Sequence, residues 1–155
     1  MTDNAALIRQ FYAAFEQKDY ATMQSLYHDD ASFSDPVFQR LNAAEVRAMW
    51  EMLINAGVDL KVSFGGIRVD EVFGMCRWEA RYTFSRTGRK VHNIIDASFE
   101  FKDGKILVHQ DTFDFWRWTR QALGMPGILL GWTPFMRNKV RATARNGLKK
   151  FMGEE

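Results

Sequence analysis

The hydrophobic pattern of this chain changes from helical to strand spacing near Gly57, and that change limits the folds open to it. Before Gly57, apolar residues recur at helical spacing, first over residues 3–17 and again over residues 42–57. After Gly57, apolar and polar residues alternate from residue 58 to residue 116, which is typical of strands with one buried face. Helices followed by a run of strands predict an α+β domain, with helices on one face of an antiparallel sheet.

Local signals set the expected limits of the first elements. We expect Asp19 to cap a short second helix that includes Tyr27 and ends near residues 28–30. Residues 32–34 should then form a short strand. The segment 42–45, Asn-Ala-Ala-Glu, has the form of a capping box, so it predicts the start of the third helix.

Four longer strands are expected in the second half of the chain, and turn residues separate them. They cover residues 58–69, 75–86, 91–102 and 105–116.

Beyond residue 116 the pattern returns to helix. Three glycines and a proline interrupt it over residues 123–132, and Thr133-Pro134 then predicts a new helix with Thr as its N-cap. We therefore expect one domain over residues 1–120. A C-terminal helical extension, residues 121–155, should pack on that domain or on a partner subunit.

The charge of the chain is unevenly distributed. From Arg117 onward there are eight Lys and Arg residues against two glutamates, although the net charge of the whole chain is only +2. A basic tail can bind nucleic acid or an anionic membrane, but charges spread around a helix are more often its solvated face. We expect no nucleic-acid partner. The apolar stripe of the last helix should dock on protein rather than on a membrane.

Other composition features argue against metal sites and disulfides. Cys76 is the one cysteine, and no Cys/His cluster with metal-ligand spacing occurs, so we expect neither a metal nor another cofactor. The first residues lack a basic segment followed by an apolar run, and no stretch approaches the ~18 apolar residues of a membrane span. These patterns predict a cytoplasmic protein.

The dipeptide Asp35-Pro36 places an acid among apolar neighbours and allows two interpretations. Asp before Pro is common in turns, because proline pushes the preceding residue toward extended geometry. Alternatively, the carboxylate could be a base held in an apolar pocket, where loss of hydration would raise its pKa.

Three segments resemble the nuclear transport factor 2-like superfamily, especially its SnoaL-like and ketosteroid isomerase-like members. They are Phe-Tyr-Ala-Ala-Phe-Glu-Gln-Lys-Asp at 11–19, Leu-Tyr-His-Asp-Asp-Ala-Ser-Phe-Ser-Asp-Pro at 26–36 and Lys-Asp-Gly-Lys-Ile at 102–106. The resemblance implies a cone-shaped curved sheet, closed by the N-terminal helices around an apolar cavity. It also implies a homodimer formed through the outer face of the sheet.

The resemblance, together with the alternation of the strands, predicts which side chains line this cavity. They are Phe11, Phe15, Phe33, Val37, Trp50, Trp78, Asn93, Ala97, Phe99 and Phe113.

Four residues are candidates for catalysis. Asp35 matches the proton-shuttling base of the ketosteroid isomerase-like members, and Asp111 lies in a segment similar to the last strand of epoxide hydrolase-like and cyclase-like members. His109, two residues before Asp111, should share its face of the strand and adjust its proton affinity. Tyr82 could donate its phenol to an oxygen of a substrate.

The sequence also departs from the isomerase pattern. Phe11 stands where those enzymes carry a tyrosine, and Ala97 stands where they carry a protonated aspartate. Asp96 lies one residue away and would face the cavity only if a bulge intervened. Steroid isomerisation is therefore not the expected reaction.

Three functions remain open: two of them concern a small molecule, and the third is a dimeric interaction module that acts through the basic C-terminal helix. The first is a small cofactor-free acid–base enzyme, of isomerase, cyclase or hydrolase type, acting on an apolar cyclic ketone, lactone or epoxide-like molecule. The second is a non-catalytic protein of the same fold that binds a hydrophobic small molecule.

Overall fold

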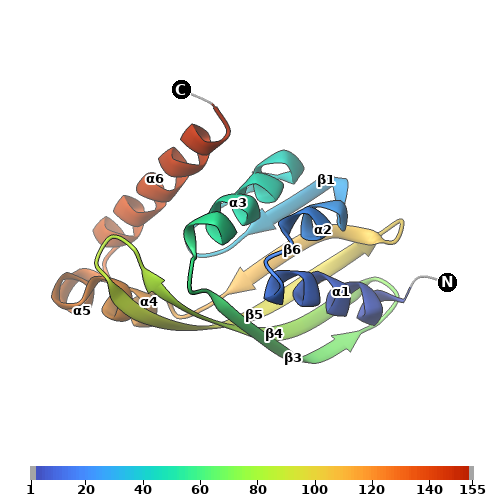
Figure 1. Cartoon of the computed structure of the whole chain (residues 1–155), viewed down its shortest axis with the longest axis horizontal. Coiled ribbons are helices and arrows are strands. Elements are labelled where there is room, and N and C mark those ends of the chain that lie inside the picture. Colours follow the sequence, from blue (N-terminus) through green and yellow to red (C-terminus); the bar gives the residue numbers. More distant parts are fainter. Residues whose placement is uncertain (1–2, 154–155) are drawn as a thin grey trace.

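Six strands form one curved sheet, and helices α1, α2 and α3 lie on one face of it (Figure 1). The structure is a computed structural model that describes residues 3–153. The strand order is β2-β1-β6-β5-β4-β3, and every neighbouring pair is antiparallel except β1 and β6, which run parallel. The α+β class and the helices-then-sheet order predicted from the sequence are confirmed.

The helices are α1 Asn4–Glu16, α2 Tyr20–Ser25, α3 Ala43–Ala56, α4 Phe115–Leu123, α5 Met125–Leu130 and α6 Pro134–Phe151. The strands are β1 Tyr27–Ser34, β2 Leu41–Asn42, β3 Lys61–Val69, β4 Phe73–Phe84, β5 Arg89–Lys102 and β6 Lys105–Thr112.

The predicted helix starts are confirmed by their caps. The Asp19 side chain accepts from the backbone N–H of Thr22, and Asn42 and Glu45 form both hydrogen bonds of a capping box. Thr133 caps α6, with Pro134 in the first turn. Each signal is local, so the sequence alone was sufficient to place it.

The prediction for residues 26–34 was wrong in its limits. Tyr27 does not end the second helix but begins β1, and the strand is longer than the expected residues 32–34. Tyr27 pairs with Ile106 of β6, and its phenol bonds to His109. These contacts with a distant strand override the helical spacing of the segment.

The prediction for the last strand was also wrong at its end. β6 stops at Thr112, because Asp114 caps α4 by accepting from the N–H of Arg117 at 3.0 Å. The glycine-rich segment contains a further short helix, α5, which Gly124 separates from α4 with a φ of +70°.

The C-terminal helices continue from the open end of the sheet, and α6 returns toward α3 (Figure 1). Leu148 of α6 is buried against the main core. The division of the chain near residue 120 stays a prediction. No described helix is long and apolar enough to cross a membrane.

Candidate active site

The parallel pairing of β1 and β6 brings the two candidate acids to one wall of the interior. Phe33 pairs with His109, and Ser34 pairs with Gln110, so Asp35 directly follows β1 at the level of Asp111. Residues two apart on a strand share a face, and Phe33 and His109 are both buried. Asp111 is also buried, whereas Asp35 is half-buried where the sheet gives way to a turn.

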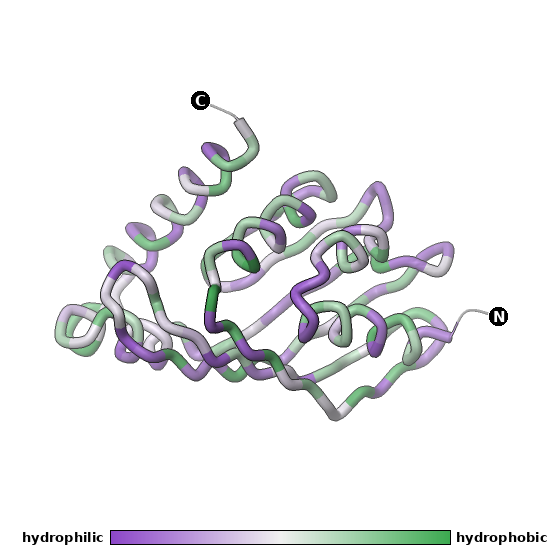
Figure 2. Tube along the Cα trace, viewed as in Figure 1, coloured by the Kyte–Doolittle hydropathy of each residue, from purple (hydrophilic) through white to green (hydrophobic). Residues whose placement is uncertain are grey.

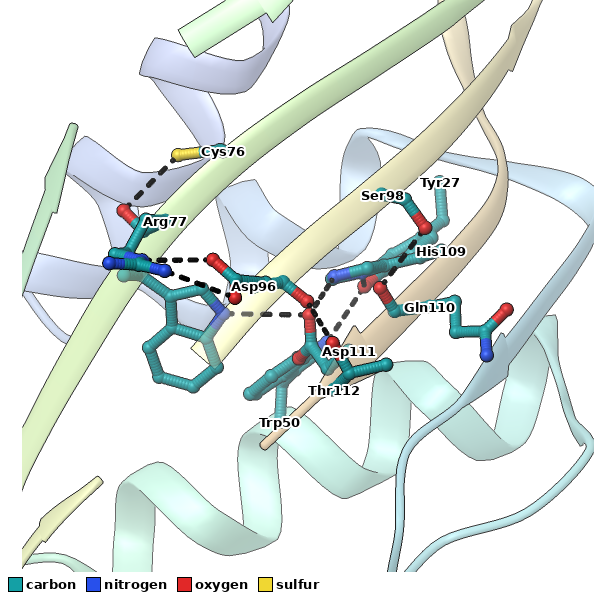
Figure 3. A network of polar contacts seen from close by, with 11 residues as sticks. Tyr27, Trp50, Cys76, Arg77, Asp96, Ser98, His109, Gln110, Asp111 and Thr112 are labelled. Carbon is teal, nitrogen blue, oxygen red and sulfur yellow. Dashed lines mark hydrogen bonds and ion pairs between the residues drawn. The ribbon is translucent and has the colours of Figure 1, made fainter. Parts of the chain in front are cut away.

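A chain of buried hydrogen bonds leads to Asp111 (Figure 3). The indole Nε1 of Trp50 donates to the Tyr27 hydroxyl at 2.9 Å, and that hydroxyl lies 2.7 Å from Nδ1 of His109. Nε2 of His109 lies 2.9 Å from Oδ1 of Asp111, and the indole of Trp78 reaches the same oxygen at 3.5 Å. Asp111 is therefore held in place by side chains from β4 and β6.

One direction in this network is set by the donor itself. An indole N–H can only donate, so the Tyr27 oxygen accepts from Trp50. The two ring nitrogens of His109 face the Tyr27 hydroxyl and Asp111, and the tautomer of the ring sets the donor in each of these two bonds. Both nitrogens of His109 are therefore in use.

Aromatic rings pack closely around His109. The ring centroids of Phe99, Phe33 and Phe11 lie 4.4, 4.9 and 5.7 Å from that of His109. Trp50 stacks on it at 6.3 Å.

The structure places the predicted lining residues inside the cone. The buried lining residues are Phe11, Phe15, Phe33, Trp50, Trp78, Ala97 and Phe99. The half-buried ones are Val37, Asn93 and Phe113. Their rings contact one another as core residues do. That a ligand enters among them stays a prediction.

Asp35 combines the two interpretations that the sequence left open. Its Oδ1 accepts from the backbone N–H of Val37 at 2.7 Å and of Phe38 at 2.6 Å, which is the geometry of an Asx turn. The pKa of its carboxyl is nevertheless raised to about 7, chiefly by burial among apolar groups and in part by the nearby charge of Asp111. The two N–H donors and the cation of Arg141 offset part of this rise.

Tyr82 lies close enough to Asp35 to be affected by its charge. Burial raises the pKa of the Tyr82 phenol, the hydrogen bond from Trp118 lowers it, and the charge of Asp35 raises it. The indole Nε1 of Trp118 donates to the Tyr82 oxygen at 2.7 Å. The proton of this phenol therefore remains able to point toward a bound molecule.

A comparison with known protein families finds a match over about two thirds of the chain. The family model of the SnoaL-like domain matches residues 8–109, more than half of the chain. The chain belongs to the SnoaL-like family. None of the curated protein sequences matches it.

Solved structures share the SnoaL-like fold at low sequence identity. An epoxide hydrolase of the LEH-like type from M. tuberculosis is 18% identical, with a TM-score of 0.63 over 81% of this chain and 93% of its own. IdmH from Streptomyces antibioticus, a proposed polyketide cyclase, is 20% identical, with a TM-score of 0.64 over 75% and 95%. TerC, crystallised with polyporic acid, is 18% identical, with a TM-score of 0.62 over 72% and 91%. These likenesses establish the fold.

Arg141 comes from α6, beyond the residues that match the SnoaL-like family model. Its Nε donates to the carbonyl oxygen of Pro36 at 2.9 Å, so it ties the C-terminal helix to the turn that holds Asp35. The sequence pattern offered no signal for this contact, because it depends on how α6 folds back.

Asp96 does not reach the interior of this SnoaL-like domain. The pairing of β4 with β5 runs without a shift past Arg77 and Asp96, so no bulge turns that carboxylate inward. Asp96 is exposed and pairs with Arg77 at 2.9 Å, while Ala97 faces the interior. His92 likewise faces outward and bonds to Glu79.

Two buried tyrosines were missed by the sequence analysis of this SnoaL-like chain. Tyr27 was assigned to a helix, so its place in the His109 network could not be seen. Tyr12, next to Phe11 on α1, is fully buried, and its hydroxyl has no hydrogen-bond partner within residues 3–153. Burial and the charge of Asp111 raise the pKa of the Tyr12 phenol, so its hydroxyl is a neutral donor near that acid. Within the same residues, no three His, Cys, Asp or Glu side chains gather as a metal site.

Proposed function

We propose that this protein is a small acid–base enzyme that moves a proton on an apolar cyclic substrate, such as a ketone, lactone or epoxide. The observation that carries the proposal is the pair of acids on one wall. Asp35 has a pKa of about 7 and lies beside the buried, hydrogen-bonded Asp111. A carboxyl group whose pKa lies near neutral pH exchanges protons efficiently.

The two acids have different surroundings, which suits different roles. Asp111 is buried and bonded to His109 and Trp78, and these two side chains keep it in position. Asp35 is poorly hydrated and close to another negative charge, which favours its protonated form. Pairs of titratable groups with divergent environments are a general mark of acid–base assignments.

We assign the proton exchange to Oδ2 of Asp35, because both backbone N–H groups bond to Oδ1. Tyr82 would donate its proton to the substrate oxygen on which negative charge develops, since its own oxygen already accepts from Trp118. Acid–base assistance of this kind contributes about 10²- to 10⁴-fold to a rate. It needs no cofactor.

The named activities of similar structures support the choice of substrate class. An epoxide hydrolase and a proposed polyketide cyclase share this fold, and TerC was crystallised with polyporic acid. Isomerase, cyclase and hydrolase chemistry all remain within the proposal. A homodimer through the outer face of the sheet also remains a prediction.

The test is turnover of a panel of cyclic ketones, lactones and epoxides, with products identified by mass spectrometry. Asp35→Asn and Asp111→Asn should each lower turnover by about 10²- to 10⁴-fold. Asp96→Asn is the matched control, since Asp96 is exposed on the opposite face. Turnover that is unchanged in both interior variants would refute the proposal.

A second candidate is a binding protein without catalysis. The observation that favours it is that both nitrogens of His109 are already bonded within the protein, which leaves this residue no free nitrogen for chemistry. This candidate predicts that apolar ligands co-purify and bind, but that no member of the panel is converted. Mass spectrometry of ligands released from the purified protein distinguishes the two functions.

A further inference from the structure

The junction of α4, α5 and α6 exposes a set of large apolar side chains. We call this set the apolar tip, and its members are Met125, Ile128, Leu129, Leu130, Trp132 and Phe135. Between 42 and 67% of each is exposed, with Phe135 and Trp132 at the top of that range. The tip lies at the end of the molecule away from α1, where the trace of α5 is strongly hydrophobic (Figures 1 and 2).

The packing of α5 explains why these side chains point outward. A Cβ added to Gly127 would lie 2.0 Å from the carbonyl oxygen of Thr119, and one added to Gly131 would lie 2.0 Å from its Oγ1. The glycines therefore form the inner face of α5, pressed against α4. The large apolar residues are left on its outer face, the reverse of an ordinary surface helix.

The segment that carries the apolar tip is basic, and two arginines lie beside α4 and α5. The sequence from Phe115 to Gly153 contains eight Lys and Arg residues and no Asp or Glu. The Arg120 guanidinium lies 4.2 Å from the ring centre of Trp116, beside α5. Arg89, from the turn between β4 and β5, bonds to the carbonyl of Gln121 and lies against Gly124, at the start of α5.

We propose that the apolar tip inserts into the surface of an anionic lipid bilayer, with the neighbouring cations against the lipid headgroups. Exposed Trp, Phe and Leu side chains flanked by Lys and Arg are the features that hold a helix in the interfacial region. Each cation near an anionic surface strengthens binding about fivefold. This inference does not depend on the proposed enzymatic activity.

Two other occupants fit the tip less well. A second copy of the chain would bring two positively charged segments together, and like charges at an interface oppose association. Nucleic acid would use the cations and the aromatic rings, but Met125, Ile128, Leu129 and Leu130 offer it no stacking surface. A lipid surface matches both the charge and the aliphatic character.

The sequence analysis expected protein rather than membrane to cover the stripe of α6. Met136 and Leu148 of that stripe are indeed buried. The apolar tip is a separate set of residues, mostly before α6, whose exposure depends on how α5 docks.

The test is flotation of the full chain with phosphatidylcholine vesicles, either alone or containing about 30% phosphatidylglycerol. The wild type should bind the anionic vesicles, and added salt should weaken the binding. Leu129→Gln with Phe135→Gln should reduce partitioning about tenfold or more. Arg89→Gln with Arg120→Gln, the two cations beside α5, should reduce it by a similar factor.

A matched control is Phe73→Gln with Met75→Gln, which changes two equally exposed apolar residues beyond the tip. This variant should float like the wild type, and circular dichroism should show that every variant is folded. The proposal is overturned if the wild type does not float, or if neutral vesicles bind it equally. It is also overturned if a single-stranded oligonucleotide binds the tip instead, or if ultracentrifugation shows a dimer that the Leu129/Phe135 variant abolishes without any vesicle binding.

Discussion

The strand that carries Asp111 and the turn that carries Asp35 lie side by side but hold their carboxylates differently. On β6, Asp111 is buried, and side-chain hydrogen-bond partners packed among aromatic rings point at it. In the turn after β1, Asp35 is half-buried, and its donors are the backbone N–H groups of its own turn. The difference teaches that a strand can fix an acid through its neighbours, while a turn can fix an acid and still leave it able to change its charge.

The largest effect should come from removing His109, the buried hydrogen-bond partner of Asp111. His109→Leu removes the hydrogen-bond partner of Asp111 and of the Tyr27 hydroxyl, both in a buried site. Leaving such groups unpaired should lower the free energy of unfolding by about 3–5 kcal/mol, measured with urea.

His92→Leu is the control for that change. His92 pairs with Glu79 where both side chains are about one third exposed, so its loss should cost about 1 kcal/mol or less. Equal losses of unfolding free energy in His109→Leu and His92→Leu would show that the hydrogen bonds around Asp111 do not act as a network.

The raised pKa of Asp35 should be visible in how the free energy of unfolding depends on pH. The folded chain keeps the proton of Asp35 up to a pH of about 7, whereas an unfolded chain releases it near pH 4. The folded state therefore binds the extra proton between these values, and its free energy of unfolding should fall as the pH rises through that range.

Asp35→Asn should remove this decrease in the free energy of unfolding with rising pH, because Asn cannot ionise but still accepts both N–H bonds. At pH 8 the variant should be more stable than the wild type by about 2–4 kcal/mol. Asp96→Asn should give no such gain, since the ion pair with Arg77 lowers the pKa of Asp96. Parallel pH curves for Asp35→Asn and the wild type would contradict the raised pKa.

The C-terminal helix allows a finer version of this test. The Arg141 cation lowers the pKa of Asp35, so Arg141→Met should move the titration of the Asp35 carboxyl carbon above pH 7 in NMR spectra. Arg145→Met, one turn along the same helix, serves as the control. An unchanged titration in the Arg141 variant would show that α6 does not affect the pKa of Asp35.

The smallest effect is expected at Tyr12. Tyr12→Phe removes a buried hydroxyl that has no partner among the described residues, so the free energy of unfolding should not fall and should rise by about 1 kcal/mol. Tyr27→Phe removes two hydrogen bonds and should cost about 1–3 kcal/mol. A large loss at Tyr12 would reveal a partner for its hydroxyl.

Local chemistry explains what the sequence could predict. Caps such as Asn42 with Glu45, and the alternation that turns Ala97 inward and Asp96 outward, depend on residues a few positions apart. Tyr27 was assigned wrongly because its partner His109 lies on a strand far along the chain. The contact of Arg141 with Pro36 was missed for the same reason.

The parallel pairing of β1 with β6 also has a consequence for how the chain is made. Residues 27–34 find their partners on β6 only when residues 106–110 exist, so the wall with both acids forms late during synthesis. Until then, the apolar faces of α1 and α3 have no finished sheet to cover. A ribosome that stalls within β5 would therefore leave an intermediate that lacks Asp111, exposes apolar surface and depends on chaperones.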